Sequence, residues 1–457
     1  MPQPTYTKAT KINRPNQRES SEGEPFTVKG SEISSAELKI ENALVEPPQT
    51  SPTNHISQSP QSPCESTPKT PRSSGKRIYF SISSEGFGHS SRVLALAKGL
   101  GDDEFLVGTY HYAAQRIESF GYPCVRVPQE VEFIGEQGSF HIGKTLIHNR
   151  ARAINLNDVV EHEMDIMQKY RISLVVADGR VAPVIAASKL KLPCVLMTNQ
   201  SAYYPFFSQD TPLVKLFGHS FEWVMQQWMS GAEEILIPDF PPPYTVCLPN
   251  LSELPQVKKR TRFVGPLVAW NPEDVVAVPR PESHPEKPLI VATMGGHAYR
   301  RPLFDAVLEL ARTSGSDYNF YILSAFTAQD VPPNVTLVHC PKDAAPYFKA
   351  ADVVLTQAGH STAMELLTLG KPSVVVPDLG QIEQENNARR LVELGVSRQV
   401  TYEQLSVASL YQSIEALRES PSFYHQAQHL AGLTGQLNSR RHVLQILEDY
   451  ATRLAAY

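Results

Sequence analysis

The chain contains 457 residues, carries a formal net charge of −5 at pH 7 and is 41% hydrophobic. This length allows several domains with real cores, and the acidic balance argues against a nucleic-acid partner. No apolar run reaches the ~18 residues of a spanning helix, and the five cysteines are too scattered for a disulfide framework or a zinc ribbon. The composition therefore excludes a membrane-spanning protein, a small disulfide-stapled domain and a cysteine-ligated metal protein.

Residues 1–75 differ in composition from everything that follows. Pro and Ser supply 23 of these 75 residues, and Tyr6 and Phe26 are the only aromatic residues. Such a segment cannot bury enough surface to offset its conformational entropy, so we predict a disordered tail. Its start lacks the apolar stretch of a secretory signal, and its glutamates argue against a transit peptide. We therefore expect a cytoplasmic protein.

From Lys76 onward, continuous apolar runs alternate with segments of helical periodicity. This alternation is typical of a parallel sheet that helices cover on both faces. In the first half of the chain, strands are expected within residues 76–83, 104–110, 173–178, 194–199, 233–240 and 262–268. In the second half they are expected within residues 288–296, 319–325, 334–340, 352–359 and 373–378.

A proline-rich segment interrupts the alternation and predicts a stiff, poorly packing connector at residues 269–287. The sequence therefore predicts an α/β fold of two doubly wound, Rossmann-like domains at residues 76–268 and 288–457. Whether the last helix returns to the first domain is left open. Ligands of such sheets bind beyond the carboxyl ends of the strands, so the predicted site lies in the cleft between the domains.

The first candidate site is the turn SEGFGHSSR, which joins a strand to a helix. Glycines Gly86 and Gly88 allow a ligand close to the backbone, and the helix start offers unpaired N–H groups. We assign these glycines and Ser90 to an acceptor-side loop. His89 is placed where an imidazole can act as a base near neutral pH. The alternative is a plain glycine turn, with Ser90 as helix cap.

The second candidate site is the turn that ends the first strand of the second domain. Gly295, Gly296 and His297 form this turn, and Arg300 follows it. Backbone donors, a helix start and a cation together suit a diphosphate. The alternative is an ordinary turn between a strand and a helix.

The strongest pattern lies between Thr356 and Ala388. A G-x-x-[ST]-x-x-E run begins at Gly359, a Gly-Lys-Pro run follows at 370–372, and Glu-Gln-x-x-Asn-Ala closes the pattern. Together these elements resemble the nucleotide-sugar signature of inverting GT-B glycosyltransferases. The group includes the peptidoglycan UDP-N-acetylglucosamine transferase, the galactolipid synthases, and related bacterial and archaeal proteins. The resemblance extends over nearly all of residues 76–450.

This resemblance implies that the first domain binds the acceptor and the second binds a UDP-sugar donor. The helix start at Gly359, Ser361 and Thr362 would hold the diphosphate, and Glu365 would accept hydrogen bonds from the ribose hydroxyls. The nucleotide base is expected against main chain near residues 339–342. The implied contacts to the donor sugar are Glu383, Gln384 and Asn387.

Two positions depart from the family pattern. Related branches have a histidine at the position of Gln357, where it contacts the diphosphate. His360 is either a displaced substitute for that histidine or a plain loop residue. The peptidoglycan enzyme has glycine at the position of Phe87, whose ring would block a ligand or stack on it. The acceptor therefore cannot be carried over from the family.

The expected activity is inverting transfer of a hexose or N-acetylhexosamine from the UDP-sugar to an acceptor hydroxyl. His89 is the expected base, and Asp178 either orients it, contacts the acceptor or only caps the next helix. No DxD motif is present, so neither a metal nor a cofactor is expected. The alternatives are a UDP-sugar epimerase or hydrolase, and a non-catalytic nucleotide-sugar-binding protein.

The partners expected are the UDP-sugar and an unidentified hydroxyl acceptor, without a protein partner. One apolar region leaves a choice between a peripheral contact at the inner face of the membrane and a buried helix or wall of the acceptor pocket. It comprises Tyr203, Tyr204, Phe206 and Phe207 with the aromatic segment at residues 214–229. The acidic net charge weakens the case for a polybasic anchor.

Overall fold

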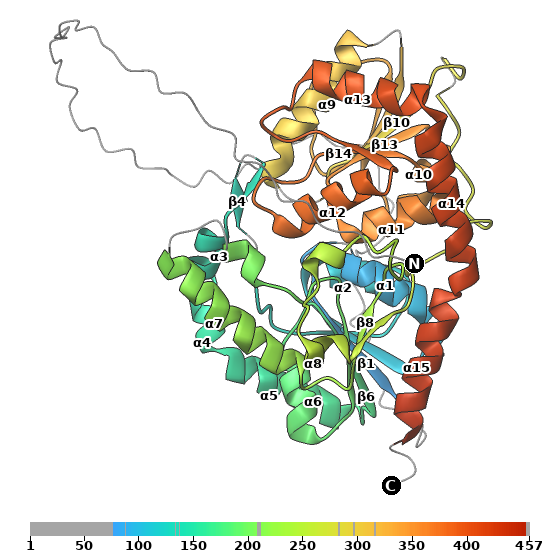
Figure 1. The fold of residues 1–457 in the computed structure, drawn as a ribbon. Helices are drawn as coiled ribbons and strands as arrows, with labels where there is room; N and C mark the ends of the chain where they lie inside the picture. Colours follow the sequence, from blue (N-terminus) through green and yellow to red (C-terminus); the bar gives the residue numbers. More distant parts are fainter. Residues whose placement is uncertain are drawn as a thin grey trace, which may run out of the picture. The chain divides into compact units, whose positions relative to one another are not determined.

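The computed structural model describes residues 76–86, 88–132, 134–136, 138–207, 212–281, 284–295, 298–314 and 317–453. The predicted tail, Phe87, Gly296 and His297 lie outside these residues. The described chain forms two parallel sheets, each with helices packed on both faces (Figure 1). The predicted doubly wound α/β fold is confirmed.

The first sheet has seven parallel strands in the order β3-β2-β1-β6-β7-β8-β9. The order reverses between β1 and β6, which makes the carboxyl ends of these two strands the expected ligand position. Its strands are β1 (Ile78–Ile82), β2 (Phe105–Thr109), β3 (Cys124–Arg126), β6 (Leu174–Asp178), β7 (Cys194–Met197), β8 (Glu234–Ile237) and β9 (Thr261–Phe263). Its helices are α1 (Gly88–Ala97), α2 (His111–Ser119), α3 (Ile142–His148), α4 (Arg150–Ile154), α5 (Leu156–Lys169), α6 (Ala182–Leu190), α7 (Pro212–Met229) and α8 (Pro255–Lys258).

The second sheet has six parallel strands in the order β12-β11-β10-β13-β14-β15, and its switch point lies between β10 and β13. Its strands are β10 (Leu289–Thr293), β11 (Asn319–Ser324), β12 (Val335–His339), β13 (Val353–Thr356), β14 (Ser373–Val375) and β15 (Ser397–Gln399). Its helices are α9 (Arg301–Thr313), α10 (Ala345–Ala350), α11 (His360–Leu369), α12 (Ile382–Glu393), α13 (Val407–Glu419) and α14 (Pro421–Leu437).

Burial on both faces explains why the strands read as continuous apolar runs. All five residues of β1 are buried. Tyr79 packs in a core with residues of α5 and α6, whereas its neighbour Phe80 packs in a second core with residues of α1. Because successive side chains of a strand point to opposite faces, every position of β1 has to be compatible with a core.

The last helix that the structure describes packs on the first domain. Helix α15 (Ser439–Arg453) follows α14 through Asn438, which has a left-handed backbone conformation. Val443 and Leu447 of α15 are fully buried in the same core as Phe80 and Leu94. Figure 1 shows α14 and α15 running as one long path from the second domain to the first. The last helix is therefore part of the first domain's core.

Two further segments join the domains. The hairpin of β4 (Gly135–Glu136) and β5 (Ser139–Phe140) leaves the first domain, and its Phe140 N–H donates to the Leu379 carbonyl at 2.7 Å. The connector expected to pack poorly is in contact with the second domain instead. Trp270 and Val275 are buried against Ala345 of α10, because apolar side chains between the prolines provide anchors.

The aromatic region at residues 203–229 is divided between core and surface. Phe207 is buried, whereas Leu216 and Trp223 of α7 are each 64% exposed. Among the helices that the structure describes, none has the length and apolarity that a membrane crossing needs. A peripheral membrane contact stays a prediction.

Candidate active site

Parallel strand pairing brings His89 and Asp178 together. Asp178 ends β6 in register with Ile82, which ends β1. The turn after β1 leads into α1, whose second residue is His89. His89 Nδ1 lies 2.8 Å from Asp178 Oδ1, and the two side chains are 19% and 3% exposed. The carboxylate thus engages Nδ1, and Nε2 is the ring nitrogen that Asp178 does not engage.

Arg92 holds the same carboxylate from the next turn of α1. Its Nε donates to Asp178 Oδ2 at 2.8 Å and its Nη2 donates to Oδ1 at 2.7 Å. Burial by itself would raise the pKa of Asp178, but Arg92 and His89 hold that pKa well below its usual range. Asp178 is therefore an ionised carboxylate beneath the imidazole.

The first turns of α1 and α11 lie side by side. A Cβ on Gly88 would overlap the Ser361 hydroxyl, so only glycine allows this approach without a shift. Both helix starts present N–H groups and the positive end of a helix dipole. Beside them, a Cβ built on Gly359 meets nothing within 4 Å. This geometry leaves room for an anionic group at the start of α11, where Ser361 and Thr362 are half-buried.

Glu365 lies one turn into α11 and faces a residue of the other domain. Loss of hydration raises the pKa of Glu365 to about 7, against an opposing effect of Arg116, while Asp343 raises it further. Arg116 extends from α2 and donates to the Ser90 and Ser91 hydroxyls at 3.0 and 2.9 Å. The Glu365 carboxyl therefore changes charge near neutral pH.

Glu383 also contacts the first domain. It follows the first residue of α12, and its Oε1 accepts a 2.6 Å hydrogen bond from Asn199 Nδ2. Asn199 follows β7, so the contact joins the carboxyl end of the first sheet to the second domain. Glu383, His89 and Glu365 thus all lie where elements of the two domains meet.

The comparisons with known proteins agree with this arrangement. Residues 308–441 match the glycosyltransferase family 28 C-terminal domain. Over 379 residues the chain is 31% identical to an uncharacterized glycosyltransferase of Methanosarcina acetivorans, covering 81% of this chain and 98% of that protein. The chain is a family 28 glycosyltransferase.

Two more comparisons extend this assignment. The glycosyltransferase is 28% identical over 184 residues to the UDP-N-acetylglucosamine--N-acetylmuramyl-(pentapeptide) pyrophosphoryl-undecaprenol N-acetylglucosamine transferase of Acetivibrio thermocellus, covering 37% and 50% of the two chains. The solved structure of CalG4, the calicheamicin glycosyltransferase, superposes with a TM-score of 0.58 at 18% sequence identity. The match covers 83% of this chain and 99% of CalG4. The predicted GT-B architecture and family resemblance are confirmed.

Several residues expected at the donor site form hydrogen bonds within the glycosyltransferase fold. Gln384 is buried, and its side chain bonds the backbone and carboxylate of Asp378. Asn387 is fully buried and bonds Asn250 and the Ala358 carbonyl. Both side chains anchor α12: Gln384 within the second domain, and Asn387 partly through Asn250 of the first domain.

Arg300 is likewise paired inside the second domain. Its Nε and Nη2 donate to Asp378, and its Nη1 donates to the Met294 carbonyl at 3.1 Å. Gly295 has a φ of +60°, and a Cβ there would overlap Arg300. The guanidinium therefore supports the turn, and a diphosphate would have to displace these bonds. The diphosphate role of Arg300 stays a prediction.

Two residues of the first turn occupy a different element from the one expected. Helix α1 begins at Gly88, so Gly88 and Ser90 belong to the helix rather than to an acceptor-side loop. Ser90 is fully buried and accepts a hydrogen bond from Arg116. Gly86 remains in the turn, with a φ of +87°.

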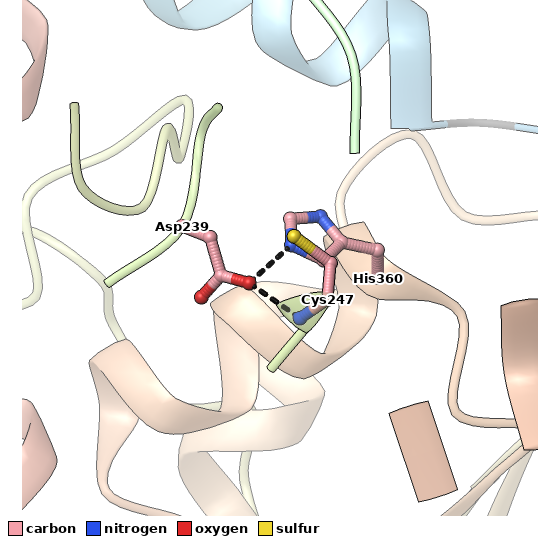
Figure 2. A group of neighbouring side chains, drawn as sticks. All are labelled: Asp239, Cys247 and His360. Carbon is pink, nitrogen blue, oxygen red and sulfur yellow. Dashed lines mark hydrogen bonds and ion pairs between the residues drawn. The ribbon is translucent and has the colours of Figure 1, made fainter. Parts of the chain in front are cut away.

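A buried cluster joins Asp239, Cys247 and His360, which sequence reasoning did not bring together (Figure 2). Asp239 Oδ2 accepts the N–H groups of Val246 and Cys247 at 2.9 and 2.8 Å and lies 3.0 Å from His360 Nε2. These residue types can ligate a metal. Here, however, Asp239 Oδ2 already accepts hydrogen bonds from these three donors. The cluster therefore connects the two domains through hydrogen bonds.

His360 therefore faces Asp239 rather than the space before α11. Gln357, at the position of the family histidine, is buried and donates to the Thr293 carbonyl at 2.9 Å. The sequence contained no signal for the pairs Asp239–His360 and Arg92–Asp178, because their members are 121 and 86 positions apart.

Proposed function

We propose that this glycosyltransferase moves a hexose or N-acetylhexosamine from a UDP-sugar to an acceptor hydroxyl, with inversion and without a metal. The observation that carries the proposal is the position of the His89–Asp178 pair at the start of α1, beside the start of α11. A base and an anion-binding helix end then lie on the two sides of one reacting carbon.

In this mechanism the acceptor O–H proton passes to His89 Nε2 as the hydroxyl oxygen attacks the anomeric carbon. The bond from that carbon to the diphosphate oxygen breaks, and the leaving UDP takes the electron pair. The N–H groups at the start of α11 and the hydroxyls of Ser361 and Thr362 stabilise the developing charge. Attack opposite the leaving group inverts the anomeric centre.

The choice of UDP rests on similarity. The Acetivibrio thermocellus relative is named as a UDP-N-acetylglucosamine-dependent transferase. A structural neighbour, the spinosyn rhamnosyltransferase SpnG, superposes with a TM-score of 0.53 and has been solved in complex with thymidine diphosphate. This complex supports a nucleoside diphosphate as part of the donor. Glu365 is the proposed ribose contact and Glu383 the proposed sugar contact.

Calorimetry with UDP, GDP and dTDP tests the donor site. We expect selective binding of UDP by the wild-type protein and at least tenfold weaker binding by Glu365→Ala. Glu385→Ala is the matched control, because the Glu385 side chain accepts a hydrogen bond from the Gly380 N–H at the exposed start of α12. A folded protein that binds none of the three nucleotides would overturn the proposal.

Turnover separates the transferase from its rivals. UDP release is followed with UDP-glucose, UDP-galactose and UDP-N-acetylglucosamine, with and without hydroxyl acceptors. Acceptor-dependent release that His89→Gln abolishes while UDP still binds is the expected result. Release without an acceptor, or isomerised donor, identifies the hydrolase or epimerase. UDP binding with neither product identifies the non-catalytic protein.

A further inference from the structure

Arg92 contacts both members of the His89–Asp178 pair, whereas a simple ion pair would need only the carboxylate. Its guanidinium donates to both oxygens of Asp178, at 2.8 Å through Nε and 2.7 Å through Nη2. The same Nη2 lies 3.0 Å from His89 Nδ1. Arg92 and Asp178 are 4% and 3% exposed at their side chains. A buried fork of this kind fixes the carboxylate in one orientation.

The fixed carboxylate decides where His89 carries its proton. Asp178 Oδ1 lies 2.8 Å from His89 Nδ1 and is the only anionic acceptor that the described side chains bring to that nitrogen. A proton on Nδ1 donates to Oδ1 and leaves a lone pair on Nε2, which is the form a base needs. In the opposite tautomer Nη2 would donate to Nδ1 at 3.0 Å, and the shorter bond from Nη2 to Asp178 Oδ1 at 2.7 Å competes with that donation.

We propose that Arg92 is a positioning residue of the transfer reaction. Through its fork on Asp178 it keeps the His89 proton on Nδ1, so that Nε2 takes the proton of the acceptor hydroxyl. Its positive charge also balances the Asp178 carboxylate. This inference rests on the proposed function in one respect: the proton that Nε2 receives is taken to come from the acceptor hydroxyl.

Gly179 supports the same arrangement independently. It follows Asp178 with a φ of +70°, and a Cβ built there would lie 2.6 Å from His89 Cε1 and 3.1 Å from Nε2. The backbone thus comes directly against the imidazole ring. Arg92 and Asp178 contact the ring at Nδ1, and the Gly179 backbone lies close to its Cε1–Nε2 edge, so both groups restrict its orientation.

The test measures the His89 tautomer by long-range ¹H–¹⁵N correlation spectra at pH 8, without any ligand. The His89 signals are assigned by their loss in His89→Gln. We expect the Nδ1–H tautomer in the wild-type protein and a clear loss of its share in Arg92→Met. Arg92→Lys keeps the charge but not the fork, and an intermediate share is expected.

The kinetic arm uses whichever UDP-sugar and acceptor the turnover screen identifies. Arg92→Met should lower kcat by about 100-fold, the lower end of what a positioned base contributes, and leave the UDP dissociation constant within twofold. A merely structural role would weaken binding and turnover together. Arg92→Lys should have a higher kcat than Arg92→Met, and the difference should follow the larger fraction of the Nδ1–H tautomer in Arg92→Lys.

Arg180→Met is the matched control. Arg180 is equally buried and pairs with Glu130 and Glu163 in the same domain, and neither ion pair involves His89 or Asp178. It should lower stability without changing the His89 tautomer. An unchanged tautomer in both Arg92 variants, or an equal change in Arg180→Met, overturns the inference. A tautomer that depends on Arg92 in a protein without transferase activity would uphold the positioning and refute the proposed function.

Discussion

At the scale of single residues, buried charge decides which side chains remain adjustable. Asp178 and Arg300 are each held in buried, forked ion pairs, in which the loss of either partner would leave an uncompensated charge. Glu365 differs, because loss of hydration raises its pKa to about 7. Of these three groups, only Glu365 changes protonation state close to physiological pH.

Nucleotide affinity should therefore depend on pH through Glu365. If the ribose hydroxyls bind the carboxylate form, that form is half populated near pH 7 and nearly complete at pH 8. With a pKa of about 7, UDP should bind about tenfold more weakly at pH 6 than at pH 8. Calorimetry over this range measures the effect. Glu365→Gln should retain only the shallower dependence that UDP's own phosphate contributes, and an equally steep curve in that variant would contradict the assignment.

At the scale of elements, two helix starts approach closely enough that a single methyl group matters. Gly88 begins α1 and lies against Ser361 of α11. Helix α1 follows β1, which lies beside the central strand of the first sheet, and α11 follows β13, one of the two central strands of the second sheet. The spacing of α1 and α11 therefore links the first domain to the second.

Gly88→Ala should separate these helix starts. We expect weaker UDP binding by about tenfold and lower turnover, with a small loss of stability, because the residue lies at a helix start where alanine is tolerated. Calorimetry and thermal unfolding check both effects. Gly88→Ala combined with Ser361→Gly removes the overlapping atoms, so the double variant should bind UDP no more weakly than Ser361→Gly alone. Additive losses would contradict the contact.

The last helix provides a second prediction at this scale. Leu447→Ala removes a fully buried side chain from the core that contains Phe80 and Leu94, and it should cost about 2–5 kcal/mol. Hydrogen exchange should increase in β1 and α1, far away in sequence, while β10 and β11 stay protected. Exchange that increases first in the second sheet would show that α15 does not stabilise the first domain.

At the scale of the whole molecule, contacts distant in sequence join the two domains. Asp239 and His360 form a fully buried pair, Asn250 bonds Asn387, and Asn199 bonds Glu383. Of these contacts, the first two are inaccessible to solvent and to substrates, and the third involves a residue proposed to bind the sugar. The buried pairs thus support the interface, while Glu383 is available to exchange its partner for a sugar hydroxyl.

His360→Ala should weaken the interface without removing the donor site. The loss should be about 1–3 kcal/mol, because Asp239 keeps its backbone donors after the imidazole is gone. Urea unfolding followed by fluorescence and by circular dichroism should change from coincident to separate transitions. Ser406→Ala is a control, since it removes the exposed cap of α13 far from the interface. Coincident transitions in His360→Ala would argue against an interdomain role.

The sequence by itself was enough to predict the doubly wound class, because buried parallel strands leave continuous apolar runs such as 174–177. It also predicted the glycosyltransferase family, because the Gly359–Ala388 signature concentrates many contacts in one contiguous segment. It missed β3, β15 and the hairpin at 135–140, which are too short for periodicity to mark. Only the tertiary structure decided that Gln384, Asn387 and Arg300 turn into the fold. It alone paired Arg92 with Asp178, and Asp239 with His360, since a parallel sheet brings together residues whose separation along the chain carries no local pattern.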